Sequence, residues 1–203
     1  YKLEHENSGE ISRLYASRDS KGQQCEVLYY FWVMQAQCPQ CQLLVDLFRS
    51  YVIARNAFPL RKPDVQVLCP ACGDIFPGLR NQVVTTCRTC GVKFDPTCGS
   101  AKGKMGCCNR CRYPFKIRDT VAATGARPVY RLYGKLVLTH AGRKEYLPAS
   151  YEDLAAFDSA AEQLRCEMND GTITLPELEL EYGYNTRQAM GYGFRSWRDF
   201  FND

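Results

Sequence analysis

The chain has 203 residues, of which 45% are hydrophobic and 12% aromatic, a composition that indicates a globular protein. The most apolar stretch, 27–34, is far shorter than the roughly 18 residues needed to cross a bilayer, which excludes a membrane-spanning segment. The formal net charge of +4 says little about partners, because the charges are unevenly distributed along the chain. Since the chain begins at Tyr1 without a signal peptide and stops at Asp203 in mid-pattern, we expect a piece of a longer protein.

The N-terminal quarter predicts a linker followed by strands. Residues 1–25 are polar and lack a sustained apolar period, so we predict a linker or mobile segment there. Residues 26–37 are rich in β-branched and aromatic side chains and predict a strand that leads into the first cysteine pair. Further strands are predicted within 43–54 and over 65–68.

Four Cys-x-x-Cys pairs follow, and each places two thiols on one tight turn: Cys38/Cys41, Cys69/Cys72, Cys87/Cys90 and Cys108/Cys111. Two such turns complete a tetrahedral site with Zn–S distances of about 2.3 Å, so the spacing predicts two zinc ions. Closed all-thiolate sites leave no open coordination position, and we expect both metals to be structural. Six disulfides of a secreted protein are the alternative, which the repeated spacing and the chain length disfavour.

The pairing of these cysteine pairs is open, because gaps of 27, 14 and 17 residues separate them. Sequential pairing closes two shorter loops and is preferred, with the first two pairs on one metal and the last two on the other. The alternative is a nested arrangement, in which the middle two pairs share one metal and the outer two share the second.

Four further cysteines remain as thiols, which fits a reducing cytoplasm: Cys25, Cys98, Cys107 and Cys166. We expect Cys25 and Cys166 to be small buried hydrophobic residues. Cys107 is an alternative to its neighbour as a ligand, but Cys108 keeps the two-residue gap to Cys111.

The C-terminal part predicts a hairpin and helices. Residues 127–149 have strand formers on both sides of an Ala-Gly turn, which predicts a β-hairpin or meander. Ser150 and Asp153 form a capping-box pattern at the start of a helix over 151–169. Two short helices are predicted in the tail, over 186–190 and 196–201.

The predicted fold class is therefore α+β: two four-cysteine zinc ribbons of short antiparallel strands, followed by the hairpin and C-terminal helices. The predicted division places a linker over 1–25, a tandem zinc-ribbon region over 26–118 and an α+β region over 119–203.

The middle of the chain is basic and its tail is acidic. Residues 101–146 carry eleven Lys/Arg against two acidic residues, whereas 150–203 carries four Arg against eleven acidic residues. Two Zn(Cys)₄ sites of about −2 each bring the whole chain near neutrality. Cations that neutralise phosphates give salt-sensitive affinity, so the basic middle predicts DNA contacts through Lys102, Lys104, Arg110, Arg112, Lys116, Arg118, Arg131 and Lys135. The simpler alternative is a solvated surface whose cations offset the charge of a nearby metal site.

No catalytic constellation is visible in the sequence, which lacks a nucleophile–His–acid motif and both common phosphate-binding glycine motifs. Electron transfer through iron held by four thiolates is a further alternative, on cysteine spacing alone.

Several segments together resemble a known family: 29–55 (YYFWVMQAQCPQCQLLVDLFRSYVIAR), 68–76 (LCPACGDIF), 85–111 (TTCRTCGVKFDPTCGSAKGKMGCCNRC), 142–164 and the ending GYGFRSWRDFFND. They are similar to the zinc-ribbon region of the DNA adenine-N6 methylases that contain a zinc ribbon. The likeness covers nearly all of 26–203. Gln42 and Arg112 depart from it, because glycine usually follows the second cysteine, and so do the extra Cys98 and Cys107.

The resemblance implies an insert in a Rossmann-like methylase, between the strand that binds S-adenosylmethionine and the catalytic loop. The family's Asp-Pro-Pro-Tyr motif is absent, since Asp95-Pro96 is followed by Thr97, and so is its glycine-rich cofactor motif. We therefore expect no enzyme activity from this chain alone, and S-adenosylmethionine only in a parent methyltransferase.

The expected function is that of a cytoplasmic, zinc-binding accessory region that contacts DNA and belongs to the same chain as the methylase core. The alternative is a structural docking module without DNA contact, whose aromatic residues Trp197 and Phe200 bind the core or another subunit.

Overall fold

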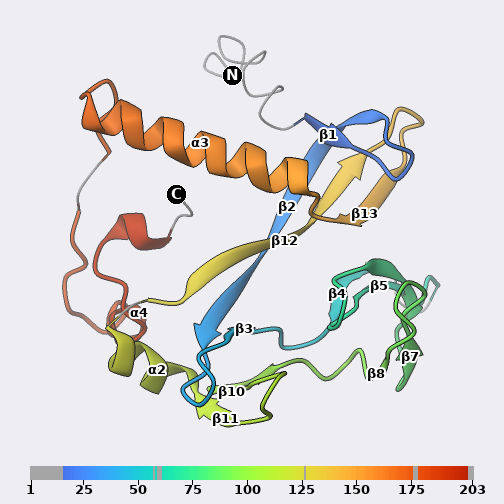
Figure 1. Ribbon diagram of the computed structural model, residues 1–203, viewed down its shortest axis with the longest axis horizontal. Coiled ribbons are helices and arrows are strands. Elements are labelled where there is room, and N and C mark those ends of the chain that lie inside the picture. The colour runs from blue at the N-terminus through green and yellow to red at the C-terminus, as the bar shows by residue number, and fades with distance from the viewer. Residues whose placement is uncertain (1–15, 57, 59–60, 126, 176–177, 201–203) are drawn as a thin grey trace. The chain divides into compact units, whose positions relative to one another are not determined.

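The computed structural model of the protein describes residues 16–56, 58, 61–125, 127–175 and 178–200 (Figure 1). Its strands are β1 Ala16–Arg18, β2 Gln24–Gln37, β3 Leu44–Asp46, β4 Val52–Arg55, β5 Asp64–Leu68, β6 Ile75–Leu79, β7 Thr85–Thr86, β8 Lys93–Phe94, β9 Ala101–Lys102, β10 Met105–Cys107, β11 Pro114–Lys116, β12 Val129–Leu138 and β13 Lys144–Pro148. Its helices are α2 Ile117–Thr124, α3 Tyr151–Asn169, α4 Arg187–Gly191 and the 3-10 helix η1 Trp197–Phe200. The mixture of antiparallel strands and few helices confirms the α+β class.

The largest sheet has the strand order β1-β2-β12-β13, and β3 pairs with the end of β2. The predicted first strand and the predicted hairpin are both confirmed, as β2 and as the antiparallel pair β12–β13. The prediction of a linker is wrong for 16–25, where Ala16–Arg18 pairs with Gln24–Glu26. Backbone hydrogen bonds hold this short ladder, so it needs no apolar period. Residues 1–15 of that prediction lie outside the described residues.

The strand predicted within 43–54 is two strands in different sheets, β3 and β4. Between them the Phe48 backbone turns toward 99–101: its N–H donates to Ser100 Oγ at 3.1 Å and its carbonyl accepts from Ala101 N–H at 2.9 Å. The approach is so close that a Cβ on Gly99 would lie 2.0 Å from the Phe48 oxygen. We call this pairing of Phe48 with Ser100 and Ala101 the neck.

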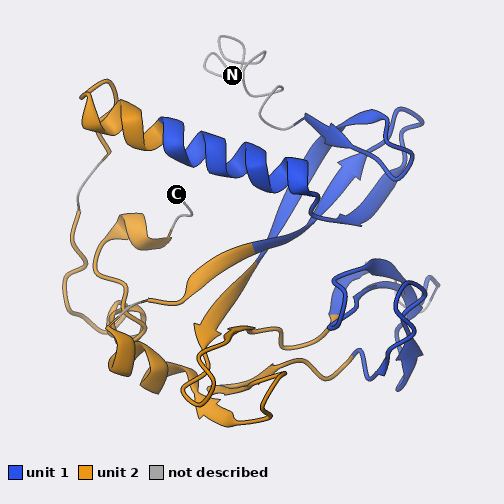
Figure 2. Ribbon diagram, viewed as in Figure 1, with its two compact units in different colours: residues 1–32, 52–96, 132–163 blue, residues 33–51, 97–131, 164–203 orange. Residues whose placement is uncertain are grey.

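The chain divides into two interleaved units (Figure 2). Unit 1 comprises 1–32, 52–96 and 132–163, and unit 2 comprises 33–51, 97–131 and 164–203. Each unit thus contains segments from both 26–118 and 119–203, the consecutive regions predicted from the sequence. The units interleave because partners distant in sequence lie together. Strand β2 pairs with β12 of the hairpin, and the Cys38/Cys41 pair lies beside the Cys108/Cys111 pair.

Helix α3 occupies the residues predicted for it and begins with the predicted capping box. Ser150 N–H donates to Asp153 Oδ2 at 2.7 Å, and Asp153 N–H donates to Ser150 Oγ at 3.2 Å. The two reciprocal bonds satisfy backbone donors that a helix N-terminus leaves free. In unit 1 the helix packs on β2 through Phe157, whose ring lies edge-on to Trp32 with centroids 4.6 Å apart.

The remaining helices were predicted in part. Helices α4 and η1 lie at the two predicted positions in the tail. Helix α2 was missed by the sequence analysis. It has only eight residues and ends at Gly125 with φ 64°, and it is held by burial of Ile117, Thr120 and Val121. Such a short helix depends on tertiary contacts more than on propensity.

A buried ionic network in unit 1 anchors the start of α3 to the sheet. Lys135 Nζ lies 2.6 Å from both Asp153 Oδ2 and Ser17 Oγ, and Ser17 donates to Asp153 Oδ1 at 2.6 Å. The Lys135 and Asp153 side chains are only 3% and 1% exposed. Burial opposes ionisation of Asp153, but hydrogen bonds from Lys135, Ser17 and Ser150 outweigh it and lower its pKa.

We expect Asp153→Ala to destabilise the protein by about 3–5 kcal/mol, because it leaves the Lys135 ammonium buried without a counter-ion. The lowered pKa means that Asp153 contributes stability above its unfolded pKa of about 3.9, and that this stability is lost as the pH falls through the folded pKa. Urea unfolding at pH 7 and at descending pH, on metal-loaded protein, measures both effects. The difference in the free energy of unfolding between wild type and Asp153→Asn should become smaller as the pH falls.

Glu152→Ala is the matched control. Glu152 pairs with Arg18 at 3.2 Å, but both side chains are more than half exposed, so the change should cost less than about 1 kcal/mol. Equal losses for the Asp153 and Glu152 variants would contradict the role assigned to the buried network.

Candidate metal centres

All four cysteine pairs adopt the same turn. The residue after the second cysteine donates its N–H to the carbonyl of the first: Gln42 to Cys38 (2.9 Å), Gly73 to Cys69 (3.0 Å), Gly91 to Cys87 (3.0 Å) and Arg112 to Cys108 (2.9 Å). The first cysteine in turn donates its N–H to the carbonyl of the residue two positions after the second cysteine: Cys38 to Leu43 (2.8 Å), Cys69 to Asp74 (2.8 Å), Cys87 to Val92 (2.9 Å) and Cys108 to Tyr113 (3.0 Å). These bonds fix the backbone so that both sulfurs of a pair face the same point.

The turn requires a positive φ at the residue that follows the second cysteine. Gly73 and Gly91 meet this requirement with φ of 77° and 74°, and glycine adopts it freely. Gln42 and Arg112 have φ of 60° and 61° at the equivalent positions, where a side chain is unfavourable. The departure from glycine noted in the sequence therefore leaves the turn geometry unchanged.

The structure pairs the turns in the nested arrangement, and the preferred sequential pairing was wrong. Cluster A consists of Cys38, Cys41, Cys108 and Cys111, and cluster B of Cys69, Cys72, Cys87 and Cys90. Loop-closure entropy favours the sequential pairing only weakly, since doubling a loop costs about 0.6 kcal/mol. The strand pairing of the ribbons and the neck decide the matter instead.

Both clusters fit a tetrahedral metal ion. The sulfurs of each cluster lie within 4.8 Å of one another, and the closest contacts are 3.6 Å. Four ligands at the Zn–S distance of 2.3 Å would stand roughly 3.8 Å apart, which matches this spacing. A disulfide would need about 2.05 Å, and none of the twelve cysteines forms one, so the disulfide alternative fails. Two tetracysteine sites could thus hold two metal ions, and zinc suits this ligand set.

Cluster A lies in unit 2, in the segments 33–51 and 97–118 that we call ribbon A. Cys38 follows β2 and Cys108 follows β10, and both are fully buried. Around them pack Ala36, Val45, Phe115 and Ile117, with Leu47 and Tyr192 at the edge. The metal would therefore join two halves of the ribbon that are distant in sequence, at the centre of this core.

Cluster B lies in unit 1, in 52–96, which we call ribbon B. Strand β5 lies between β4 and β6 and is followed directly by Cys69, and Cys87 directly follows β7 of the small β7–β8 pair. The two cysteines pack with Val65, Val67 and Phe76 in a small core. Across the turns, Thr89 Oγ1 donates to Asp74 Oδ2 at 2.6 Å. Ribbon B also packs on the sheet of unit 1, where a Cβ on Gly134 would lie 2.8 Å from Ile75 Cδ1.

The thiols of each cluster do not ionise alike without metal. In cluster B the backbone N–H of Cys90 lowers the pKa of Cys87 to about 7. For Cys72, the backbone N–H of Asp74 lowers the pKa, but desolvation and the neighbouring thiols together outweigh it and raise the pKa to about 12. Cluster A repeats this contrast: burial opposes ionisation of Cys108, but backbone N–H bonds lower its pKa to about 7, while the pKa of Cys111 is raised to about 12. Metal binding must therefore displace protons from each cluster.

The other cysteines lie outside both clusters. Cys107 donates its thiol to the Arg112 carbonyl at 3.6 Å, and Cys108 is the cluster member, as predicted. Cys25 is buried beside Val27 and Val137, as predicted. The prediction for Cys166 was wrong: it is exposed, because only Asp153 of α3 is buried and the rest of the helix surface is at least partly open to solvent.

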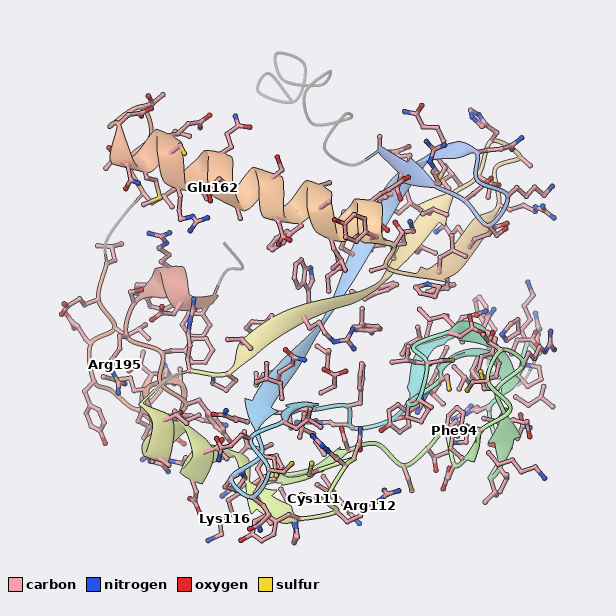
Figure 3. The ribbon with its side chains drawn as sticks, in the orientation of Figure 1. Phe94, Cys111, Arg112, Lys116, Glu162 and Arg195 are labelled. Carbon is pink, nitrogen blue, oxygen red and sulfur yellow. The ribbon has the colours of Figure 1, made fainter. Side chains whose placement is uncertain are left out.

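The predicted cationic residues fall into two groups. Six of them are exposed and belong to ribbon A: Lys102, Lys104, Arg110, Arg112, Lys116 and Arg118. None of the six forms an ion pair with any residue that the structure describes. Figure 3 shows Arg112 and Lys116 near Cys111 in the same part of unit 2. These six side chains are therefore open to solvent, and their contact with DNA stays a prediction.

The other two predicted residues differ. Lys135 is 2% exposed and ion-paired with Asp153, so its proposed DNA contact was wrong. Strand alternation points the Lys135 side chain toward α3, where it pairs with the buried carboxylate of Asp153. Arg131 is exposed, but both ends of its guanidinium bind the carboxylate of Asp46, which neutralises its charge.

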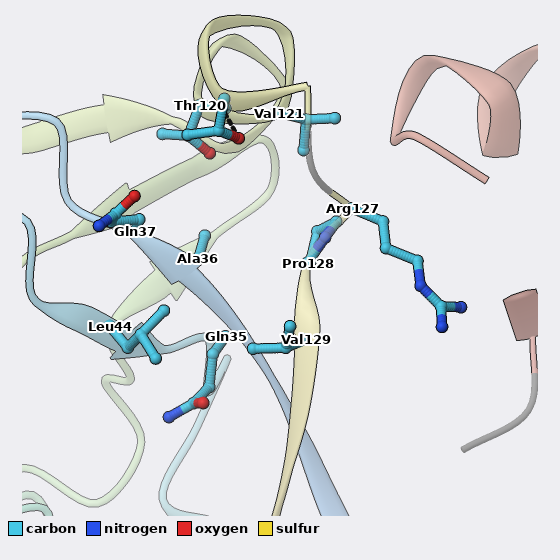
Figure 4. A pocket seen from close by; sticks show the side chains of 10 residues that line it. Gln35, Ala36, Gln37, Leu44, Thr120, Val121, Arg127, Pro128 and Val129 are labelled. Atoms are coloured by element: carbon cyan, nitrogen blue, oxygen red, sulfur yellow. Dashed lines mark hydrogen bonds between the residues drawn. The ribbon is translucent and has the colours of Figure 1, made fainter. Parts of the chain in front are cut away.

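Unit 2 also contains a pocket of about 120 Å³ between the end of β2, α2 and the start of β12 (Figure 4). Its polar side chains are engaged elsewhere: Thr120 donates to the Ile117 carbonyl at 2.7 Å, and Arg127 pairs with Asp199 at 3.3 Å. The pocket is mainly apolar and brings together no acid, base and nucleophile.

Comparison with known proteins finds no matching family model, no matching curated protein and no matching solved structure. Among the described residues, no helix is both long and apolar enough to pass through a bilayer.

Metal analysis of paired substitutions tests the nested arrangement. Wild type should bind two zinc ions, and Cys41→Ser/Cys108→Ser should retain one, because both residues belong to cluster A. Cys41→Ser/Cys72→Ser should retain none, because it removes one ligand from each cluster. Native mass spectrometry reads the stoichiometry directly, and circular dichroism should show that chelation unfolds the ribbons.

The two double variants carry the same number of substitutions, so each controls for the other. Sequential pairing would reverse the two results. A coloured protein containing iron would contradict the assignment of zinc.

Proposed function

We propose that this chain is a zinc-stabilised, DNA-binding accessory region, and that ribbon A contacts DNA phosphates through its exposed cations. The observation that carries the proposal is a row of side chains across the small sheet β9–β10–β11. Met105 is directly opposite Lys102 on one side and Lys116 on the other. Directly opposed residues of antiparallel strands share a face, so the two lysines flank Met105 on one surface.

The opposite face of this sheet belongs to the core. Gly106 is directly opposite Ala101 and Phe115, and all three are buried. A Cβ on Gly106 would lie 2.7 Å from the Phe115 ring, which therefore covers it. Because the core holds one face, strand register places the row of cations on the solvent side.

Charge balance distinguishes this surface from a shell that merely offsets the metal. Ribbon A holds seven Lys/Arg and one acidic residue, which leaves about four positive charges in excess of a Zn(Cys)₄ centre of −2. Ribbon B holds six Lys/Arg and three acidic residues, which leaves about one. A shell that only neutralises the metal would be similar in both ribbons, whereas the excess in ribbon A suits a polyanionic partner.

The metals in this proposal have a structural role. Cysteine thiolates occupy all four positions of each centre, so no site remains for water or substrate. The resemblance to zinc-ribbon DNA adenine-N6 methylases supports a further proposal, that the chain belongs to an S-adenosylmethionine-dependent DNA adenine methyltransferase in the cytoplasm. Ribbon A would then add phosphate contacts to those of a catalytic core elsewhere in the parent chain.

We expect Lys102→Ala/Lys116→Ala to weaken binding to duplex DNA uniformly across sequences. Each lost phosphate contact should reduce the slope of log K against log salt by about 0.9, so the double variant should lower it by about 2. Fluorescence anisotropy with a labelled duplex, titrated at several salt concentrations, measures the slope.

Lys62→Ala/Lys93→Ala is the charge-matched control, since both lysines are exposed on ribbon B. It should leave the slope nearly unchanged. Absence of DNA binding by the wild-type protein at low salt, or equal losses in the two double variants, would contradict the proposed function.

The second candidate is the docking module, which an exposed aromatic surface in the tail favours. Trp197 and Phe200 are 53% and 46% exposed, although their rings contact each other with centroids 5.9 Å apart. Large exposed aromatic side chains are enriched where proteins bind each other. If the tail docks on a methylase core, Trp197→Ala/Phe200→Ala should abolish assembly with that core in gel filtration and leave DNA binding intact. If the double variant still assembles, this candidate is wrong.

A further inference from the structure

The turns of the two ribbons have the same backbone hydrogen bonds but differ in the residue that follows the second cysteine. In ribbon B, glycine follows the second cysteine of both pairs, and its positive φ is free of strain. In ribbon A, Gln42 and Arg112 hold the same positive φ with full side chains. A strained conformation persists only where the surrounding structure enforces it, and such residues cluster at functional sites.

The Gln42 side chain is engaged within the chain. Its Nε2 donates to the Pro39 backbone carbonyl at 3.2 Å, inside its own turn. The Gln42 backbone carbonyl also accepts from Gln37 Nε2 at 3.2 Å, a bond that any residue at this position could make. Arg112 differs in this respect. Its guanidinium is exposed and forms no hydrogen bond or ion pair with a described residue, and its backbone alone is engaged, by Cys107 and Cys108.

Charge alone does not account for an arginine here. A lysine would offset the metal centre equally well. The charge of Arg112 also acts on the buried Tyr51 hydroxyl, where it lowers a pKa that burial raises, and a lysine would do the same. What arginine adds is a planar fork of donors, which binds two acceptors at once.

Resting on the proposed DNA binding, we infer that Arg112 is a specificity-determining residue that reads a base edge, with the O6 and N7 acceptors of guanine as its target. Bidentate contact to guanine in the major groove is the commonest specific use of arginine. The turn that carries Arg112 is fixed by two backbone hydrogen bonds and by cluster A, so the fork is presented from a rigid base. Lys102 and Lys116 of the same ribbon supply phosphate contacts that position the protein without selecting sequence.

The experiment is selection of bound duplexes from a random-sequence pool, followed by competition binding with the selected duplex and with guanine replaced. Wild type should select a motif containing guanine, and replacement of that base should weaken binding by about tenfold or more. Arg112→Gly should lose that discrimination while retaining most of the salt slope, and Arg112→Lys should lose it although the charge remains. Lys102→Ala/Lys116→Ala should bind more weakly but keep the same motif.

Thermal stability separates a recognition role from a structural one. Arg112→Gly relieves the positive φ and should raise the melting temperature by about 2–4 °C while discrimination falls. Gln42→Gly is the control: it relieves the same strain and should leave discrimination unchanged, although it also removes the hydrogen bond to the Pro39 carbonyl and so should stabilise less.

The inference is overturned if Arg112→Gly selects the same motif as wild type, or if it lowers the melting temperature and thereby identifies a structural residue. DNA binding by wild type without any selected motif would overturn this inference and leave the proposed function standing. Absence of binding by wild type would overturn both.

Discussion

This structure depends on two clusters, in each of which four cysteine thiols lie close enough to bind one metal ion. Each cysteine pair is shaped locally, by two backbone hydrogen bonds and a positive φ within its own turn. A single turn of this kind is too small to be stable, and its buried sulfurs contribute little apolar surface. If each cluster holds zinc, the free energy of metal binding, about 10–16 kcal/mol for a structural zinc site, would be the main stabilisation of each ribbon. Strands of two to five residues are sufficient around such centres.

The nested pairing gives the two centres unequal tasks. Cluster B closes a compact segment, 52–96, whose strands are neighbours in sequence. Cluster A joins residues that precede that segment in the sequence to residues that follow it, and therefore closes a longer loop of chain. The neck, where Phe48 bonds to Ser100 and Ala101, brings the two halves of ribbon A together. A long loop is entropically affordable here because closure entropy rises only slowly with length.

The same arrangement explains why the cations gather on one ribbon. The small sheet β9–β10–β11 turns Gly106 and Phe115 into the core, so alternation leaves Lys102, Met105 and Lys116 in solvent. The dense thiolate charge of cluster A lies beneath this surface, and the cations exceed what is needed to offset it. Elsewhere basic side chains are paired with carboxylates, Lys135 with Asp153 in the core and Arg131 with Asp46 at the surface. A count of Lys and Arg along the chain cannot separate these two fates.

The sequence by itself determined whatever depends on neighbours along the chain. The eight ligands follow from Cys-x-x-Cys spacing, and α3 follows from its capping box, because both patterns are local. Strand β2 and the β12–β13 hairpin were likewise readable from residue type and one turn. Only the tertiary structure decided which turns share a metal, because equivalent turns carry no label for their partners and the entropy difference between pairings is small. It also decided that Lys135 is buried and Arg112 strained and free, since burial and backbone dihedrals are set by what packs against a residue.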